Sequence, residues 1–331
     1  MPLLSRRRFI GITAAAAGLG LVRFNRAAQA DAHLVTWRGQ AMGAVATLQV
    51  HHRDRTAAER LVERALAEVR RLEAVFSLYR EDSALVALNR HGVLVAPPAD
   101  LIALLGESRR WWELTEGAFD PTVHPLWTLY WGHFSKPNPD PQGPPEPELR
   151  EALGRVGFDR VRFDSNRIVF ARRDMGLTLN GIAQGYVTDR VVDILRAGGI
   201  TSSLVDMGEP RALGTRLLGE PWRVGIVDPD CPGEVGETLE VVDQAIATSG
   251  GYGFHFDAAG HFNHLLDPRT GASARLHRSV TVVLPRATAA DALSTAFSLL
   301  PPEGVGRTLQ RLGEGQARLI TMEGERYTLN A

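Results

Sequence analysis

The chain has 331 residues, of which 44% are hydrophobic and 23% are charged, and its formal net charge at pH 7 is −1. This length supports a substantial core, and the ordinary composition excludes a fibrous, repetitive or largely disordered protein. Cys231 is the only cysteine and Lys136 the only lysine. The sequence therefore excludes an internal disulfide and argues against Schiff-base chemistry and a lysine-based phosphate loop.

The first 30 residues have the pattern of a Tat-type export signal. The twin arginines Arg6-Arg7 stand in the frame S-R-R-x-F-I, a mild apolar run follows from Ile10 to Val22, and the segment closes on Ala28-Gln29-Ala30. The run is short and rich in Ala and Gly for a membrane span. We therefore expect residues 1–30 to direct the folded protein to the periplasm. Without their five arginines the remaining chain has a formal charge of −6, which argues against nucleic acid or anionic lipid as a partner.

The first half of the chain is predicted to contain strands followed by two helices. Residues 35–52 read as strand material. The segment 57–79 has the apolar stripe of an amphipathic helix, at Ala58, Leu61, Val62, Ala65, Val69, Leu72 and Phe76. A second helix is expected from Ala99 to Leu114, ended by Gly117. The Pro-rich stretch 136–147 is the best candidate for an insertion or hinge.

The second half mixes short strands with helices. Strands are expected at Val161–Phe163, Ile168–Phe170, Ser203–Val205, Trp222–Val227, Ser279–Leu284 and 317–322, a hairpin around 254–266, and a helix from Ala289 to Leu300. Strands and helices do not alternate regularly, and no internal repeat is visible. We therefore expect an α+β fold of mixed sheets with packed helices, forming a single domain over residues 31–331.

The stretch "LTLNGIAQGYVTDRVVDILRAGG", residues 177–199, predicts a strand that enters a helix through glycine. Such a turn can aim the unpaired backbone N–H groups of a helix N-terminus at an anion. The stretch is neither GxGxxG nor GxxxxGK[ST], and no lysine stands nearby to neutralise a phosphate. An Asn-Gly turn whose glycines let the helix pack close to the sheet is the alternative interpretation.

A set of side-chain oxygens is expected in "ATAADALSTAFSLL". Asp291, Ser294 and Thr295 are three and four residues apart, so a helix would project them from one face. One carboxylate and two hydroxyls suit Mg²⁺ or Ca²⁺ better than zinc. Alternatively, Thr288 and Asp291 have the spacing of a capping box, in which Asp291 only closes the start of the helix.

His264 and Asp267 lie in "FNHLLDPRTG", at the end of a predicted strand and before a turn. A histidine there could take a proton from a nucleophile, because its ordinary pKa lies near neutral pH. A strand-end histidine beside an Asx-type turn is the alternative. Asp267 could orient His264 or merely close the turn. The stretch "ATSGGYGF", with Thr248 and Ser249, could hold a phosphate or form a simple turn.

Phe119 and Asp120 follow Gly117 in "TEGAFDPTVHPLW". An aromatic ring beside an acid could stack on a flat heterocycle and hydrogen-bond to it. A helix C-cap followed by a buried Phe is the alternative explanation.

Eight short motifs follow one another along the chain: "AMGAVATL", "FSLYREDSALVALNR", "GAFDPTVHPLW", "LNGIAQGYVTDR", "DMGEPRALG", "ATSGGY", "HLLDPRTG" and "ADALSTA". In this order they resemble the ApbE-type FAD:protein FMN transferases, from about Met42 to Leu300. No single motif is decisive, but eight in sequence are far more specific than any lone glycine motif.

The resemblance implies that FMN passes from FAD to a Ser or Thr hydroxyl of an acceptor flavoprotein through a phosphoester bond, with release of AMP. It implies His264 as the base. It implies FAD contacts at Met42, Tyr79, Ala118, Phe119, Asp120, Thr178, Gln184 and Leu266, and a Mg²⁺ site at the Gly181 carbonyl, Asp291, Ser294 and Thr295. The anion of the glycine turn would then be the pyrophosphate of FAD, with Mg²⁺ in place of the missing lysine.

The sequence also departs from the family pattern. Thr178 stands where an acid is usual, Gln184 where Lys or Glu is common, Gly250-Gly251-Tyr252 where Gly-Asn/Asp-Tyr is more frequent, and Asp206-Met207-Gly208-Glu209 lacks the usual Gly-Gly-Asp. These departures concern the nucleotide-binding half. The variant "LTLNGIAQGYVTDR" is similar to the subset of the family linked to nitrous-oxide reductase maturation, in which a membrane-bound flavoprotein is the acceptor.

Two other functions are compatible with the same residues. A Mg²⁺-dependent FAD pyrophosphatase would use water as the nucleophile. A non-catalytic periplasmic flavin carrier would bind FAD and dock on a partner.

Overall fold

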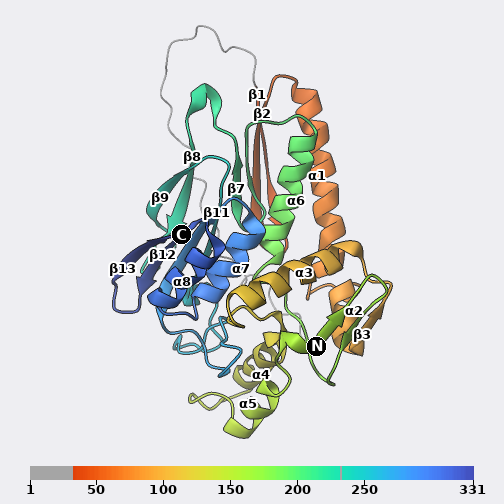
Figure 1. Ribbon diagram of the computed structural model, residues 1–331, viewed down its shortest axis with the longest axis vertical. Helices are drawn as coiled ribbons and strands as arrows, with labels where there is room; N and C mark the ends of the chain where they lie inside the picture. The colour runs from red at the N-terminus through yellow and green to blue at the C-terminus, as the bar shows by residue number, and fades with distance from the viewer. Residues whose placement is uncertain (1–32, 232) are drawn as a thin grey trace.

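The computed structural model describes residues 33–231 and 233–331 (Figure 1). The export signal expected at residues 1–30 lies outside the described residues. Within the described ranges, no helix is both long enough and apolar enough to cross a membrane.

An eight-stranded antiparallel sheet forms the centre of the molecule (Figure 1). Its order is β1-β2-β6-β7-β10-β11-β12-β13, so strands from both ends of the chain complete it. Their bounds are β1 His33–Ala41, β2 Ala44–His52, β6 Ser203–Asp206, β7 Pro210–Leu213, β10 Ala245–Ser249, β11 His277–Leu284, β12 Gln316–Thr321 and β13 Arg326–Asn330. Together with the packed helices, this confirms the predicted α+β class.

Helices cover one face of the sheet and enclose the main core. They are α1 (Arg55–Phe76), α3 (Ala99–Leu114), α6 (Ala183–Ala197), α7 (Ala287–Phe297) and α8 (Pro302–Leu312). α1 packs against α6 and α6 against α7, side by side in Figure 1. All seven predicted stripe positions of α1 are buried, because that stripe is the face turned toward the core. Its first turn is capped by Asp54, which accepts the Ala57 N–H at 2.9 Å.

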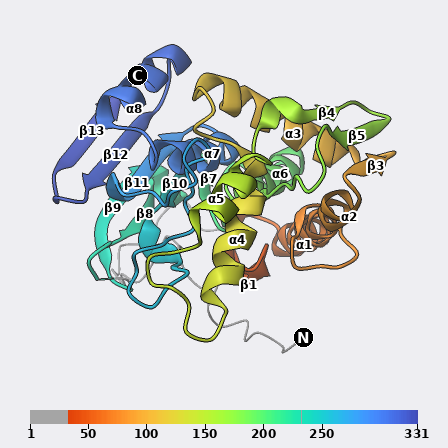
Figure 2. The same ribbon diagram turned by 90° about the horizontal axis from the view of Figure 1, so that it is seen from below.

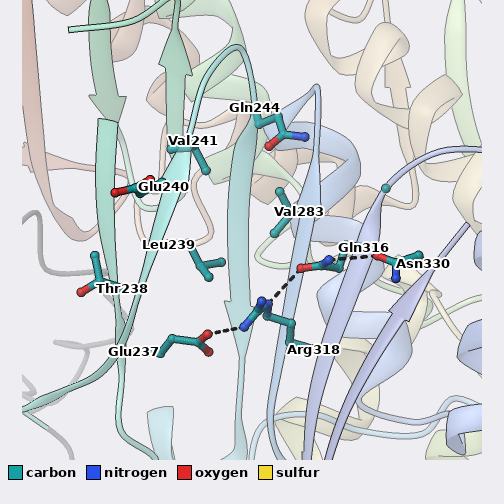
Figure 3. Close-up of a pocket in the computed structure, with 11 residues that line it drawn as sticks. Glu237, Thr238, Leu239, Glu240, Val241, Gln244, Val283, Gln316, Arg318 and Asn330 are labelled. Carbon is teal, nitrogen blue, oxygen red and sulfur yellow. Dashed lines mark hydrogen bonds and ion pairs between the residues drawn. The ribbon is translucent and has the colours of Figure 1, made fainter. Parts of the chain in front are cut away.

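The other face of the sheet carries a hairpin of β8 (Trp222–Val227) and β9 (Val235–Val241). Trp222 and Val224 pack on Leu204 and Ile246 of the sheet in a second, smaller core. Figure 3 shows the groove beside this hairpin, where Glu237 forms an ion pair with Arg318, and Gln316 donates a hydrogen bond to Asn330.

The remaining elements form two groups, seen from below in Figure 2. In one group, α4 (His124–Phe134) packs on α5 (Glu146–Leu153) in a third core. In the other, α2 (Ala84–His91) lies beside a three-stranded sheet of β3 (Val93–Val95), β5 (Arg167–Phe170) and β4 (Val161–Phe163), and both contribute to the main core. The Pro-rich stretch 136–147 connects α4 to the start of α5.

The strand expected before α6 does not form. Leu177 exchanges two hydrogen bonds of 2.8 Å with the Asn89 side chain, and the Thr178 N–H donates to the Pro121 carbonyl at 2.8 Å. These contacts are to a side chain and a loop, so the segment runs extended without joining a sheet. The helix that follows ends at its C-cap Gly198.

Candidate active site

The first turns of α6 and α7 touch each other. A Cβ atom placed on Gly185 would overlap the backbone carbonyl of Ala287, and one on Gly181 would lie 2.8 Å from Thr295 Oγ1. The glycines therefore let α6 begin directly against α7. Gly181 and Asp291, more than 100 residues apart in the sequence, are brought to one junction.

Replacing Gly185 by alanine should damage this junction severely. The added methyl group meets backbone atoms of Ala287 and Thr288, which cannot rotate away. We expect a loss of unfolding free energy of about 3 kcal/mol or more, above the usual cost of overpacking.

Gly106→Ala is the matched control, because Gly106 also lies inside a helix but has open space around its Cβ position. That variant should be neutral or slightly more stable. Chemical denaturation of both variants checks the prediction, and equal stabilities would contradict the close packing.

Each of the two helices caps the other. On α7, Asp291 accepts the Gly185 N–H of α6 at 3.0 Å. On α6, Asp189 accepts the Ala287 and Thr288 N–H groups of α7, both at 3.0 Å, and the Thr288 hydroxyl at 2.6 Å. Both carboxylates thus satisfy free N–H groups at the start of the opposite helix. The capping-box alternative for Asp291 is wrong, because its carboxylate bonds to a different helix.

The three α7 residues predicted to form the oxygen set, Asp291, Ser294 and Thr295, have different neighbours. Asp291 and Thr295 face the start of α6. Ser294 donates to the Asp291 carbonyl at 3.0 Å and lies 2.8 Å from the Ser249 hydroxyl at the end of β10. Ser294 therefore links α7 to the sheet, while Asp291 and Thr295 line the junction. Ser249 and the adjacent Thr248, which bonds to Thr281 at 2.9 Å, end a buried strand.

The Asp291 carboxylate is 4% exposed, and no described group donates a hydrogen bond to its Oδ1 atom. Burial, with a further contribution from the charge of Asp189, raises the pKa of Asp291 to about 7. A buried carboxylate with an open oxygen requires a proton or a cation. This is the chemistry expected of a ligand for a hard divalent ion.

Two further buried acids, Glu209 next to Asp291 and Asp206 next to Glu209, were not identified as site residues from the sequence. Burial raises the pKa of Asp206 to about 7. Burial, followed by repulsion from Asp291 and Asp206, raises the pKa of Glu209. Both belong to the Asp206-Met207-Gly208-Glu209 segment, whose departure from the family pattern was the only signal in the sequence. No group of three His, Cys, Asp or Glu side chains in the described ranges is placed to hold a metal alone.

His264 is held by one backbone carbonyl. Its own N–H and its ring Nδ1 both lie 3.2 Å from the Phe254 oxygen. Because a carbonyl can only accept, Nδ1 carries the proton and Nε2 keeps its lone pair. Burial, with a smaller contribution from the neighbouring His255, lowers the pKa of His264 to about 4, so the ring is neutral near pH 7 and can accept a proton through Nε2.

Asp267 closes the turn after His264. Its carboxylate accepts the Arg269 N–H at 2.8 Å and pairs with the Arg269 guanidinium at 2.9 Å. No hydrogen bond among the described residues joins Asp267 to His264. The structure thus favours the turn-closing role over the orienting role.

Aromatic residues of α4 pack against the loop that carries His264. Phe254 stacks on Trp127 and Trp131, at ring separations of 6.4 and 6.1 Å, and lies edge-on to His264 at 6.3 Å. The same strip of α4 contributes Tyr130, whose hydroxyl donates to the Gly271 carbonyl at 3.0 Å. α4 thereby fixes both ends of the loop that carries the histidine.

Several expected FAD contacts lie along the entry to α6. The Tyr79 hydroxyl bonds to the Asn180 side chain, Thr178 lies against the 118–121 loop through Pro121, and Gln184 packs on Gly208. Met42 sits in the β1–β2 turn with a positive φ of 50°, and its N–H donates to Glu73 Oε1 at 2.7 Å.

The other four expected contacts, Ala118, Phe119, Asp120 and Leu266, are buried. Phe119 is 4% exposed and packs in the main core, so its ring is not placed to stack on a ligand. The Asp120 carboxylate accepts from the Thr122 N–H and the Phe158 N–H. The structure therefore favours the alternative explanation of a buried Phe over a ring that stacks on a ligand. Ala118, which precedes Phe119, is buried as well. Leu266 is buried against Leu126 and Tyr130 of α4.

Comparison with known proteins gives the family. The ApbE family model matches residues 42–319. The chain belongs to the ApbE family. An FAD:protein FMN transferase of Haemophilus influenzae is 32% identical over 88% of this chain and 86% of its own length. One of Treponema pallidum is 33% identical over 78% of this chain and 76% of its own.

Solved structures of the family share the fold. The ApbE protein of Thermotoga maritima is 28% identical and superimposes with a TM-score of 0.78, covering 90% of this chain and 97% of its own. The flavin transferase ApbE of Vibrio cholerae, also 28% identical, has a TM-score of 0.77 and covers 91% and 97%. The predicted family is confirmed.

Proposed function

We propose that this protein transfers FMN from FAD to a Ser or Thr hydroxyl of an acceptor protein, releases AMP and depends on Mg²⁺. The relatives named FAD:protein FMN transferase support the reaction class. The observation that carries the proposal for this chain is the α6–α7 junction, where the start of one helix and the open oxygen of Asp291 meet.

The residues at the junction fit a magnesium ion. Of the four expected ligands, Asp291 Oδ1, Thr295 Oγ1 and the Gly181 carbonyl would hold it, whereas the Ser294 hydroxyl is bonded to Ser249 and to the Asp291 carbonyl. Hard oxygen ligands of this kind are those that Mg²⁺ prefers. When bound, the ion would neutralise charge on the diphosphate of FAD. Since three acidic or imidazole ligands are not assembled in the described ranges, phosphate oxygens and water would have to supply the remaining ligands.

His264 would act as the general base. The acceptor hydroxyl would give its proton to Nε2, and its oxygen would form a bond to the phosphorus on the flavin side of FAD. The bond from that phosphorus to the bridging oxygen would break, and AMP would leave with that oxygen. The Nδ1–H bond to Phe254 supports this role, because it keeps the lone pair on the outward nitrogen.

FAD would lie along the entry to α6. The side chains of Met42, Tyr79, Thr178 and Gln184 would contact it. Leu266 would contribute through its backbone, because its side chain is buried against α4. Ala118, Phe119 and Asp120 would contribute through their backbone, because the Phe119 ring and Asp120 carboxylate are engaged inside the fold.

Residues 1–30 would direct export by the Tat pathway to the periplasm. The supporting observation is the twin-arginine pattern of the sequence. The acceptor would be a periplasm-facing flavoprotein, and the similarity of "LTLNGIAQGYVTDR" to the nitrous-oxide reductase subset points to a membrane-bound one.

The test is incubation of the purified protein with FAD, Mg²⁺ and a co-expressed candidate acceptor, read by in-gel flavin fluorescence. We expect fluorescence on the acceptor, matched by AMP release that depends on the acceptor. Fast AMP release without any acceptor labelling would instead show an FAD pyrophosphatase. Tight FAD binding with neither product would show a carrier.

A further inference from the structure

Asp189 is fully buried and is contacted by five polar groups from two parts of the chain, residue 211 and residues 286–288. Arg211 Nη1 lies 2.6 Å from its Oδ1 and Arg286 Nε 3.2 Å from its Oδ2. The other three donors are the two N–H groups and the hydroxyl at the start of α7. Both carboxylate oxygens are therefore used, and the two guanidinium groups compensate the charge.

The bonds that Asp189 makes to the start of α7 also affect the position of Asp291. Asp189 follows Gly185 by four residues, so both lie on the α6 face that meets α7. On α7, Asp291 follows Ala287 by the same interval. The Asp189 bonds fix the start of α7, and the Asp291 bond to Gly185 lies one turn further along that helix. A shift at Asp189 would thus move Asp291 relative to the Gly181 turn.

We propose that Asp189 is a positioning residue of the reaction, which sets the distance between Asp291 and the Gly181 turn and thereby the affinity for the divalent cation. This inference rests on the proposed function, in which that cation is bound between them. Outer groups that orient ligands commonly change metal affinity by about 10- to 100-fold when they are removed.

Asp193 offers a matched comparison on the same helix. It is paired with Arg286 at 3.4 Å and lies 3.9 Å from Arg211. Its side chain is 34% exposed, and the bonds to the α7 backbone come from Asp189. Removal of its charge changes the same arginine network without releasing the start of α7.

Two substitutions separate position from charge. Asp189→Asn keeps the shape of the side chain but removes its charge and turns an amide NH₂, which cannot accept a hydrogen bond, toward groups that also donate. Thr288→Val keeps the Asp189 charge and removes only the 2.6 Å hydroxyl bond. A purely electrostatic role would be affected by the first variant alone, whereas positioning predicts an effect of both.

The experiment measures Mn²⁺ binding in the presence of FAD by electron paramagnetic resonance, together with the Mg²⁺ dependence of the transfer rate and the Tm. We expect Asp189→Asn to weaken cation binding by about 10-fold or more and Thr288→Val by about threefold, with transfer recovering at high Mg²⁺. Asp193→Asn should stay within about twofold of the unmodified protein.

Unchanged Mn²⁺ affinity in Thr288→Val would overturn the inference, even if Asp189→Asn weakens binding or Tm falls. If Asp189→Asn does not fold, Thr288→Val alone decides it. Cation binding that shifts as expected in a protein without transfer activity would contradict the proposed function and leave the positioning role supported. A protein that binds no Mn²⁺ with FAD would contradict both.

Discussion

Asp291→Asn should abolish FMN transfer while leaving the protein folded. The amide oxygen can still accept the Gly185 N–H, so the α6–α7 junction is kept. The negative charge offered to the cation is lost. We expect the transfer rate to fall by about 10²-fold or more at millimolar Mg²⁺, measured by flavin fluorescence on the acceptor.

The stability of Asp291→Asn should change in the opposite direction. The folded-state pKa of Asp291 is raised from 3.8 to about 7, so the folded protein binds the proton more tightly than the unfolded chain. Stability therefore decreases as pH rises through that window, and the neutral amide removes this loss. Without Mg²⁺ and above pH 7, the variant should melt at or above the Tm of the unmodified protein. Mg²⁺ with FAD should raise the Tm of the unmodified protein only.

His264→Gln should slow transfer by about 10²- to 10⁴-fold, the usual contribution of a general base. FAD and Mg²⁺ binding should persist, because the imidazole is held by Phe254 and not by the α6–α7 junction. Single-turnover transfer at saturating FAD checks the chemical step. A rate within a fewfold of the original would contradict the base role and favour a histidine that only ends the loop.

The pH dependence of the unmodified protein provides a second measurement on His264. Its pKa is lowered from 6.5 to about 4, so the neutral ring persists as pH falls below 6.5. At saturating Mg²⁺, we expect no loss of transfer attributable to His264 until the pH approaches 4. A step in the rate near 6.5 that disappears in His264→Gln would show an ordinary, solvated histidine.

Asp267→Asn is the matched control for the His264 loop. Its carboxylate bonds to Arg269 and its N–H to Ala272, so the substitution weakens the turn without touching the imidazole. The transfer rate should remain within about threefold of the original, since exposed pairs of this kind contribute little energy.

Local patterns predicted the long elements well. α3 has the predicted bounds, and α1 buries the whole predicted stripe, because an amphipathic period of this length has few alternatives. α4 was not predicted. Its aromatic side chains pack on Phe254, Phe256 and Phe262, and these partners lie more than 100 residues away in the sequence. The prediction of a strand at the start of residues 177–199 was wrong. Leu177 bonds to the Asn89 side chain and not to a neighbouring strand, and Asn89 is also distant in the sequence.

Only part of the candidate site could be predicted from the sequence. Asp291, Thr295 and Gly181 were chosen from spacing and resemblance, and the structure brings them together. Asp189 was not identified from the sequence, because the groups that contact it come from residues 211 and 286–288. Glu209 and Asp206 were likewise missed, since burial is a property of the tertiary fold. Pairing between distant residues is what a single sequence shows least.

Anomalous diffraction from crystals grown with FAD and Mn²⁺ tests the central claim most directly. The account predicts one strong manganese peak at the α6–α7 junction, within bonding distance of Asp291 Oδ1 and the FAD diphosphate. Manganese bound elsewhere with the diphosphate, or FAD seated away from the Gly181 turn with no metal beside Asp291, would contradict it.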